Sequence, residues 1–257
     1  MTRRQSPRFA LTLIELIIVI GGLLFLAALL LPIIARLRSA AGSVNSSNNL
    51  RQFGIAVHNY HDSFGKMPPG MGQANNADGP IHFHILPFIE QENLFRAAEG
   101  APWKNGTYGK VIPTYIDPAD ASAPPGHVYQ GWLATTNYAA NWMVFRTGDK
   151  RLQDITDGTS NTLMTATRYQ MCNGHPTGWG YASLYHWAPL FAIDSTAKFQ
   201  ISPKQEECDP TVPQTIGTSM LVGFCDGSVR NIEPTVSPRT WYFLCDPADG
   251  NVLENDF

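Results

Sequence analysis

The chain opens with a polar, basic segment that gives way to one long apolar run. Arg3, Arg4 and Arg8 come first, and the 20 residues 16–35 contain no charged side chain. A helix of that length rises by about 30 Å, the hydrocarbon thickness of a bilayer. A secretory signal has a shorter apolar region followed by its cleavage site, whereas here the small residue Ala10 comes before the run. The pattern therefore predicts a helix that spans the membrane to about residue 35.

Beyond this run the chain becomes polar but keeps a helical period. Apolar residues recur three or four positions apart and so fall on one helix face. They are Leu50, Phe53, Val57, Tyr60 and Phe64. Gly65 can end the helix, and the two prolines that follow cannot continue it. One helix of roughly 13–63 is predicted, its first half in lipid and its second half packed on a globular head.

A single carboxylate, Glu15, stands at the start of the apolar run. An unpaired charge is costly in lipid, so a simple membrane anchor gains nothing from it. Cleavage after Ala10 would create an α-amino group on Leu11, four residues before Glu15. A pair between that amine and Glu15 of a neighbouring copy would fix the stagger between identical helices.

Residues 8–20 read Arg-Phe-Ala-Leu-Thr-Leu-Ile-Glu-Leu-Ile-Ile-Val-Ile, which resembles the type III signal of type IV pilins and type II secretion pseudopilins. The resemblance implies that a prepilin peptidase cuts between Ala10 and Leu11 and that the new amine is methylated. Glu15 then takes the fifth mature position, as in that family. Pro32 falls where many pilins also carry a proline, and proline bends a helix by removing one hydrogen bond. Two departures are Ala10 in place of glycine and Leu11 in place of phenylalanine.

Further motifs follow in order along the chain. They lie in residues 48–70, 85–91, 112–118, 157–162 and 224–230. Together they resemble a narrower group of large pilin-like proteins, which is classed as a domain of unknown function and sometimes labelled solute-binding-like. Asp117 stands where that group usually has a cysteine. The resemblance implies no agreed enzyme chemistry.

Turn signals predict strands near the end of the chain. Asp226-Gly227 favours a two-residue hairpin turn, because both residues accept the positive φ that such a turn needs. Residues 241–245 and 251–253 are predicted to form a second hairpin. The predicted fold class is therefore α+β, with a long N-terminal transmembrane helix packed on an antiparallel β-sheet head, as in pilins.

The predicted domain organisation has three parts. Residues 1–10 form a leader that is cleaved, residues 11–64 form the long pilin helix, and residues 65–257 form the β-rich head. Charged residues make up only 15% of the chain and the net charge is −3, so no basic surface for nucleic acid is expected. No nucleophile elbow, Walker loop or Rossmann glycine pattern occurs, so no enzyme is predicted.

One segment gathers oxygen-bearing side chains of the kind that calcium binds. These are Asp154, Asp157, Ser160 and Asn161, although the spacing of an EF-hand is absent. The favoured interpretation is structural, in which Asp157 or Ser160 caps a helix that begins before Leu163. No other cofactor is predicted.

The cysteines become informative if the head lies outside the cytoplasm, where thiols oxidise. Four cysteines permit three pairings. Cys225 and Cys245 end strands of the two predicted hairpins, while Cys172 and Cys208 flank one loop-rich segment. Disulfides 225–245 and 172–208 are the favoured pairs.

These features predict a structural subunit of a type IV pilus-like or type II secretion pseudopilus-like filament. Its partners would be the prepilin peptidase, copies of itself or other pilins, and the bacterial inner membrane. The head would be extracytoplasmic before assembly and part of a periplasmic or cell-surface filament afterwards.

The alternative is a membrane-anchored ligand- or carbohydrate-binding module. Four tryptophans could line its binding face, although core packing explains them equally well. They are Trp132, Trp142, Trp179 and Trp187. A surface pocket lined by tryptophans would favour this alternative.

Overall fold

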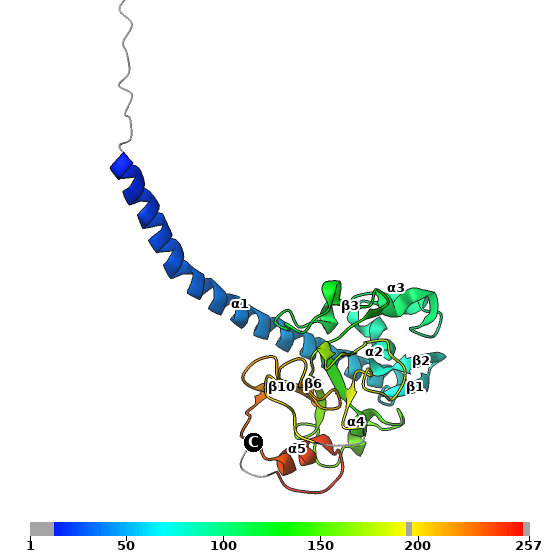
Figure 1. Ribbon diagram of the computed structural model, residues 1–257. Coiled ribbons are helices and arrows are strands. Elements are labelled where there is room, and N and C mark those ends of the chain that lie inside the picture. Colours follow the sequence, from blue (N-terminus) through cyan, green and yellow to red (C-terminus); the bar gives the residue numbers. More distant parts are fainter. Residues whose placement is uncertain (1–12, 194–196, 254–257) are drawn as a thin grey trace, which may run out of the picture. The chain divides into compact units, whose positions relative to one another are not determined.

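The structure, a computed structural model, describes residues 13–193 and 197–253 (Figure 1). The chain divides into two compact units, Met1–Ser43 and Val44–Phe257, and the second is called the head below. The longest helix, α1 (Leu13–Phe64), ends inside the head.

The other elements are short, as a chain with 22 Gly and 19 Pro would suggest. The α-helices are α2 (Ile81–His84), α3 (Glu92–Ala97), α4 (Trp142–Phe145) and α5 (Pro238–Cys245). The strands are β1 (Met71–Ala74), β2 (Ala77–Pro80), β3 (Val128–Tyr129), β4 (Leu133–Ala134), β5 (Tyr138–Asn141), β6 (Leu163–Thr167), β7 (Met171–Cys172), β8 (His175–Pro176), β9 (Leu190–Phe191), β10 (Met220–Phe224) and β11 (Val229–Ile232). Short 3-10 helices are η1 (Leu86–Ile89), η2 (Lys104–Gly109), η3 (Pro113–Tyr115), η4 (Pro125–His127) and η5 (Leu152–Asp154).

A five-stranded sheet in the order β11-β10-β6-β5-β9 lies at the centre of the head. Its neighbours are antiparallel except for β5 and β9, which are parallel, so the predicted antiparallel sheet is corrected at this edge. The remaining strands form two-stranded ladders, β1-β2, β3-β4 and β7-β8. Two buried clusters use opposite faces of the sheet: one includes residues of α1 and the other residues of α5 (Figure 1).

A bulge in β6 decides which side chains face which cluster. Val222 of β10 is opposite Ala166, but Phe224 is opposite Leu163, so one extra β6 residue lies between the pairs. That residue is Met164, which joins the α1 cluster, while the paired residues join the α5 cluster. An extra residue of this kind reverses the alternation of a strand. The bulge thus supplies apolar side chains to both faces.

The last part of α1, residues 44–64, packs on the head and is called the docked stretch. Four of the five residues of the predicted apolar stripe are buried, which confirms it there, whereas Phe64 is 44% exposed. Polar residues such as Arg51 and Asn59 occupy the exposed side. The helix ends as predicted, because Gly65 takes a φ of +71° and donates to the His61 carbonyl at 2.7 Å.

The hairpin β10–β11 is confirmed, but its turn differs from the predicted one. The Gly227 N–H donates to the Phe224 carbonyl at 2.9 Å, and of Asp226-Gly227 only Gly227 has a positive φ, +82°. A single left-handed residue is enough because the turn is longer than two residues. Gly54 of α1 lies against this turn, since a Cβ on Gly54 would be 3.4 Å from Gly227 Cα.

The second predicted hairpin is wrong. Residues 238–245 form helix α5, and residues 251–253 have no regular structure. The Ser237 hydroxyl accepts the Thr240 N–H at 3.0 Å, and Pro238 occupies the first turn. A serine cap followed by proline is a strong helix start, and it outweighs the strand preference of the aromatic residues that follow.

The prediction of a transmembrane helix is also corrected. In the described part of the chain, no helix has both the length and the apolar character needed to cross a bilayer. The α+β class of the head is confirmed.

Candidate functional site

The predicted assembly residues fall mostly beyond what the structure describes. Ala10 and Leu11 lie outside the described residues, as does the whole predicted leader. Glu15 and Pro32 lie within the bounds of α1, but their side chains are outside the described part. Cleavage at Ala10 and pairing by Glu15 therefore stay predictions.

The oxygen-rich segment holds other parts of the backbone in place. The two carboxylate oxygens of Asp157 accept the N–H groups of Asp249 (2.7 Å) and Gly250 (3.0 Å). Asp154 instead accepts the Arg151 N–H at 2.7 Å, and Asn161 donates to the Asp157 carbonyl at 3.1 Å. The two carboxylates thus serve different segments.

The structural interpretation of this segment also needs correction. Leu163 begins strand β6, so neither Asp157 nor the exposed Ser160 caps a helix there. Asp157 instead fastens the loop after α5. Calcium binding stays a prediction.

Three of the sequence motifs meet where the docked stretch contacts the sheet. The N–H groups of Cys225 and Asp226 donate to the carbonyls of Thr162 and Thr159, both at 2.9 Å. From α1, His58 Nε2 lies 3.0 Å from the Cys225 carbonyl. Residues 48–62, 157–162 and 224–230 therefore form one contact, called the seam below.

A second polar contact fixes the beginning of the docked stretch. The Ser46 hydroxyl donates to the Asp117 carboxylate and lies 2.9 Å from the Tyr138 hydroxyl. Asn49 donates to the Ile116 carbonyl at 2.9 Å and to Tyr138 at 3.2 Å. Burial raises the pKa of the Asp117 carboxyl, although its bonds from Ser46 and the Ala119 N–H oppose the rise. Asp117, which takes a cysteine's place in the family motif, thus anchors the helix to the head.

The histidines have structural partners. His82 is fully buried, and its Nε2 lies 2.8 Å from the Tyr138 carbonyl oxygen. Among the described residues, no group of three or more potential metal ligands comes together. Burial lowers the pKa of His82 to about 3 and also lowers that of His84. A neutral imidazole that donates to a backbone carbonyl is a packing element of the core.

The structure has one of the two predicted disulfides. Cys172 and Cys208 are bridged, with 5.6 Å between their Cα atoms. Cys225 and Cys245 are free thiols, so the 225–245 pair is wrong. They belong to separate buried clusters, because Cys225 follows β10 and Cys245 ends α5 rather than a strand.

The four tryptophans do not share one face. Trp179 is fully buried and donates to the Lys110 carbonyl at 2.9 Å. Trp142 is half-buried at the edge of a different surface hollow from Trp132. Trp187 packs against Trp132, with ring centroids 6.1 Å apart.

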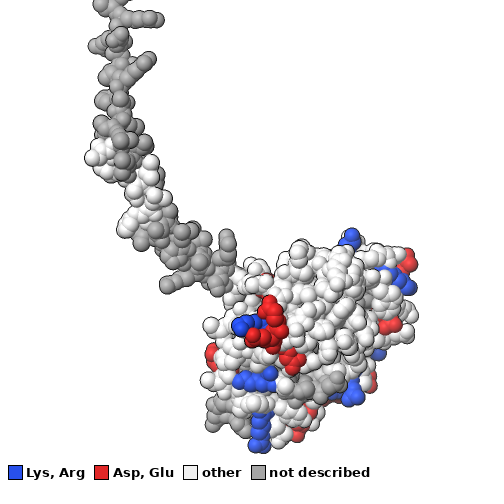
Figure 2. Space-filling view, viewed as in Figure 1, with Lys and Arg blue, Asp and Glu red and all other residues white. Residues whose placement is uncertain are grey.

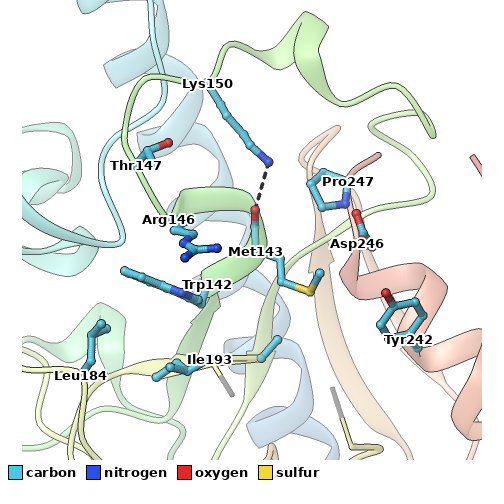
Figure 3. Close-up of a pocket in the computed structure, with 11 residues that line it drawn as sticks. Trp142, Met143, Arg146, Thr147, Lys150, Leu184, Ile193, Tyr242, Asp246 and Pro247 are labelled. Atoms are coloured by element: carbon cyan, nitrogen blue, oxygen red, sulfur yellow. Dashed lines mark hydrogen bonds between the residues drawn. The ribbon is translucent and has the colours of Figure 1, made fainter. Parts of the chain in front are cut away.

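The hollow beside Trp142 has a volume of about 820 Å³ and mixed charge (Figure 3). Arg146 lies next to Trp142, while Tyr242 and Asp246 approach from the α5 side. Lys150 is already engaged, because its ammonium donates to the Met143 carbonyl at 3.1 Å. Figure 2 shows a group of acidic side chains beside a basic one on the viewed face of the head, with wide uncharged areas around them.

The hollow beside Trp132 is smaller, about 400 Å³, and aromatic. Its lining is Trp103, Tyr108, Trp132, Leu133, Gly180, Tyr181, Ala182 and Ser183. This set is called the aromatic hollow. Its residues come from η2 and the residue before it, from β4 and the residue before it, and from the loop after Trp179, which are far apart in the chain. Their spacing gave no signal of this meeting, so only Trp132 was singled out from the sequence.

The head is thus an α+β domain whose motifs meet along one helix. A family model described as "Protein of unknown function (DUF1559)", with the short name SBP_bac_10, matches residues 35–239. Because the match covers well over half of the sequence, the chain belongs to this family, whose members are commonly pilin-like proteins. No curated protein and no solved structure matches the chain.

The family match confirms the resemblance drawn from the internal motifs. Residues 8–20, which resemble the pilin and pseudopilin signal, lie outside the matched range. The finer assignment to type IV pili or type II secretion therefore rests on those residues alone.

Proposed function

We propose that the protein is a structural subunit of a pilin-like filament, cleaved after Ala10 and assembled through its N-terminal segment. The observation that carries the proposal is the seam. Three of the family's motifs are used to hold the docked stretch of α1 on the sheet, through Gly54, His58 and the β10–β11 turn. A protein whose role is to present a head on a helix needs that contact to be rigid.

Two further features support the proposal. The Ser46, Asn49 and Asp117 contacts fix the helix at the point where it enters the head. The Cys172–Cys208 disulfide is typical of proteins that fold outside the cytoplasm, where a filament head would lie. In the assembled filament, Glu15 would pair with the Leu11 amine of a neighbour and set the stagger.

The test is assembly of a Glu15→Ala variant in the native host. We expect filament yield to fall at least about tenfold, because one buried charge pair is lost per subunit contact. Mass spectrometry of the parent should show loss of residues 1–10 and a methylated amine. Glu92→Ala, which removes an exposed carboxylate of α3 that pairs with Arg96, is the matched control and should assemble normally.

Circular dichroism and thermal melting of each variant report on the fold of the head. Equal assembly of Glu15→Ala and parent would reject the registry role. A mature chain that retains Met1 would reject the processing step.

A further inference from the structure

The aromatic hollow is built mainly from rings that remain partly open to solvent. Trp103 is 47% exposed and Trp132 is 38% exposed. Both line the same cavity of about 400 Å³, together with Tyr108 and Tyr181. Large aromatic side chains normally contribute by burial, so two open tryptophans at one concave site are a feature of binding surfaces.

Three of the four rings of the hollow pack against other aromatic rings. Trp132 packs edge-on against Tyr108, with ring centroids 5.6 Å apart, and at a tilt against Trp187, with centroids 6.1 Å apart. Trp187 packs in turn on Tyr181, with centroids 5.3 Å apart. The Trp187 indole donates to His175 Nδ1 at 3.1 Å. A ligand would therefore meet walls that lose little freedom on binding.

Glycines let the walls of the hollow approach one another. A Cβ on Gly180 would lie 2.8 Å from Tyr108 Cβ, and one on Gly109 would lie 2.9 Å from the Trp132 carbonyl oxygen. A Cβ on Gly178 would lie 2.7 Å from a Leu133 methyl group. At these three positions any residue larger than glycine would force neighbouring atoms to move. The close approach of the walls therefore depends on these glycines.

The chemistry of the lining selects a class of ligand. All eight lining residues are uncharged, so an ionic headgroup or phosphate would find no counter-charge there. In the described part of the chain, no protein group bonds to the hydroxyls of Tyr108, Tyr181 or Ser183. A ligand that offers apolar faces to the rings and hydrogen-bonding groups to the hydroxyls would use the whole lining.

We propose that the aromatic hollow binds a neutral saccharide. A pyranose presents C–H groups, which carry partial positive charge, to the electron-rich face of an indole. Its hydroxyl groups can pair with the three tyrosine and serine hydroxyls. A quaternary ammonium would also suit the rings, but it cannot form a hydrogen bond with any of the three hydroxyls. The volume suits one or two sugar rings.

The site goes beyond the proposed filament role and is independent of it. A filament subunit with this hollow would display one saccharide site per head, and Glu15→Ala would leave binding by the purified subunit unchanged. Failure of assembly and failure of sugar binding are therefore separate results.

The experiment is isothermal titration calorimetry with the full-length protein in buffer free of glycoside detergents. The probes are tetrasaccharides of β-1,4-linked glucose, β-1,4-linked N-acetylglucosamine, α-1,4-linked glucose and β-1,4-linked mannose. Choline and adenosine monophosphate are titrated separately, as ligands of two other chemical classes. We expect at least one tetrasaccharide to bind with a dissociation constant between about 10 μM and 1 mM. Neither choline nor adenosine monophosphate should bind.

Variants locate the site and separate stacking from hydrogen bonding. Trp103→Ala and Trp132→Ala should each weaken binding at least about tenfold, and Tyr181→Phe about threefold, because it removes only a hydroxyl. Tyr242→Ala, whose ring is also 38% exposed but lines the other hollow, is the matched control and should bind normally.

Thermal melting confirms that each variant is folded. If Trp132→Ala does not fold, the result for Trp103→Ala decides the outcome. The proposal is overturned if none of the four tetrasaccharides binds, or if choline or the nucleotide binds instead. Binding that is unchanged in Trp103→Ala also overturns it.

Discussion

The docked stretch of α1 and the loop-rich segment 168–215 are both held to the head, but by different groups. The docked stretch is fixed mainly by an apolar stripe against the sheet. The loop-rich segment has few strands and relies on buried polar side chains that bond to backbone. Regular elements satisfy their own backbone, whereas loops inside a protein need side chains to do so.

Arg168 is the central example in the loop-rich segment. Its guanidinium is 1% exposed and donates to four carbonyls: Ala188 at 3.0 Å, Leu190 at 2.9 Å, His186 at 2.6 Å and Pro210. Burial lowers its pKa to about 10, which still leaves it charged at neutral pH. One cation thus gathers the strand β9, the turn before it and the loop near Pro210.

Replacing Arg168 should destabilise the loop-rich segment more than the other changes considered below. Arg168→Met leaves several buried carbonyls unpaired, and we expect a loss of about 3–5 kcal/mol in the free energy of unfolding. Urea unfolding followed by circular dichroism measures it. Arg96→Met makes the same change on an exposed side chain and should stay within about 0.5 kcal/mol. Equal stability of the two variants would show that the loops do not depend on Arg168.

Removing the disulfide tests the same segment by a different route. The bridge closes a separation of 36 residues, so Cys172→Ala with Cys208→Ala should cost about 2–4 kcal/mol through the freer unfolded chain. Cys225→Ala, which removes a free buried thiol from the α1 cluster and keeps the bridge, should cost less and should lose stability under a reducing agent as the parent does. An unchanged urea midpoint for parent protein under reduction would contradict the role of the bridge.

The smallest expected effect concerns Asp117 at the start of the docked stretch. Its pKa is raised in the folded protein, chiefly by burial, so the folded state binds this proton more tightly than the unfolded state. Stability from this group is therefore greatest below the unfolded pKa and declines as pH rises through the folded pKa. We expect Asp117→Asn to flatten that decline and to change stability at neutral pH by no more than about 1 kcal/mol.

The control for Asp117 is Asp62→Asn, an exposed carboxylate at the end of α1. Unfolding curves measured from mildly acidic to neutral pH give the comparison. A steeper decline in Asp117→Asn than in the parent would contradict the assigned direction of the pKa shift.

The contrast between the docked stretch and the loop-rich segment also explains which features could be predicted from the sequence. The stripe of the docked stretch and the β10–β11 hairpin were predictable, because helical period and an Asp-Gly turn are local signals. Residue Arg168 has no such signal: a lone arginine among loops reads as exposed until its partners are known. The aromatic hollow was missed for the same reason, since its walls come from distant segments.

Three of the sequence predictions are wrong. Residues 241–245 contain Trp, Tyr and Phe, which favour strands, but the Ser237-Pro238 cap ahead of them begins helix α5. The pairing of Cys225 with Cys245 depended on that mistaken strand. The membrane-spanning helix was inferred from an uninterrupted apolar run, and the described residues contain no helix that meets the requirement.

The two free thiols, Cys225 and Cys245, can report local opening of the head by their reaction with a thiol reagent. Cys225 lies in the cluster under α1 and Cys245 in the cluster under α5, and both are fully buried. Burial raises the pKa of each, so neither thiolate reacts while its face stays closed. The labelling rate of Cys225 therefore measures how often α1 separates from the sheet, and that of Cys245 how often α5 does. No introduced probe is needed.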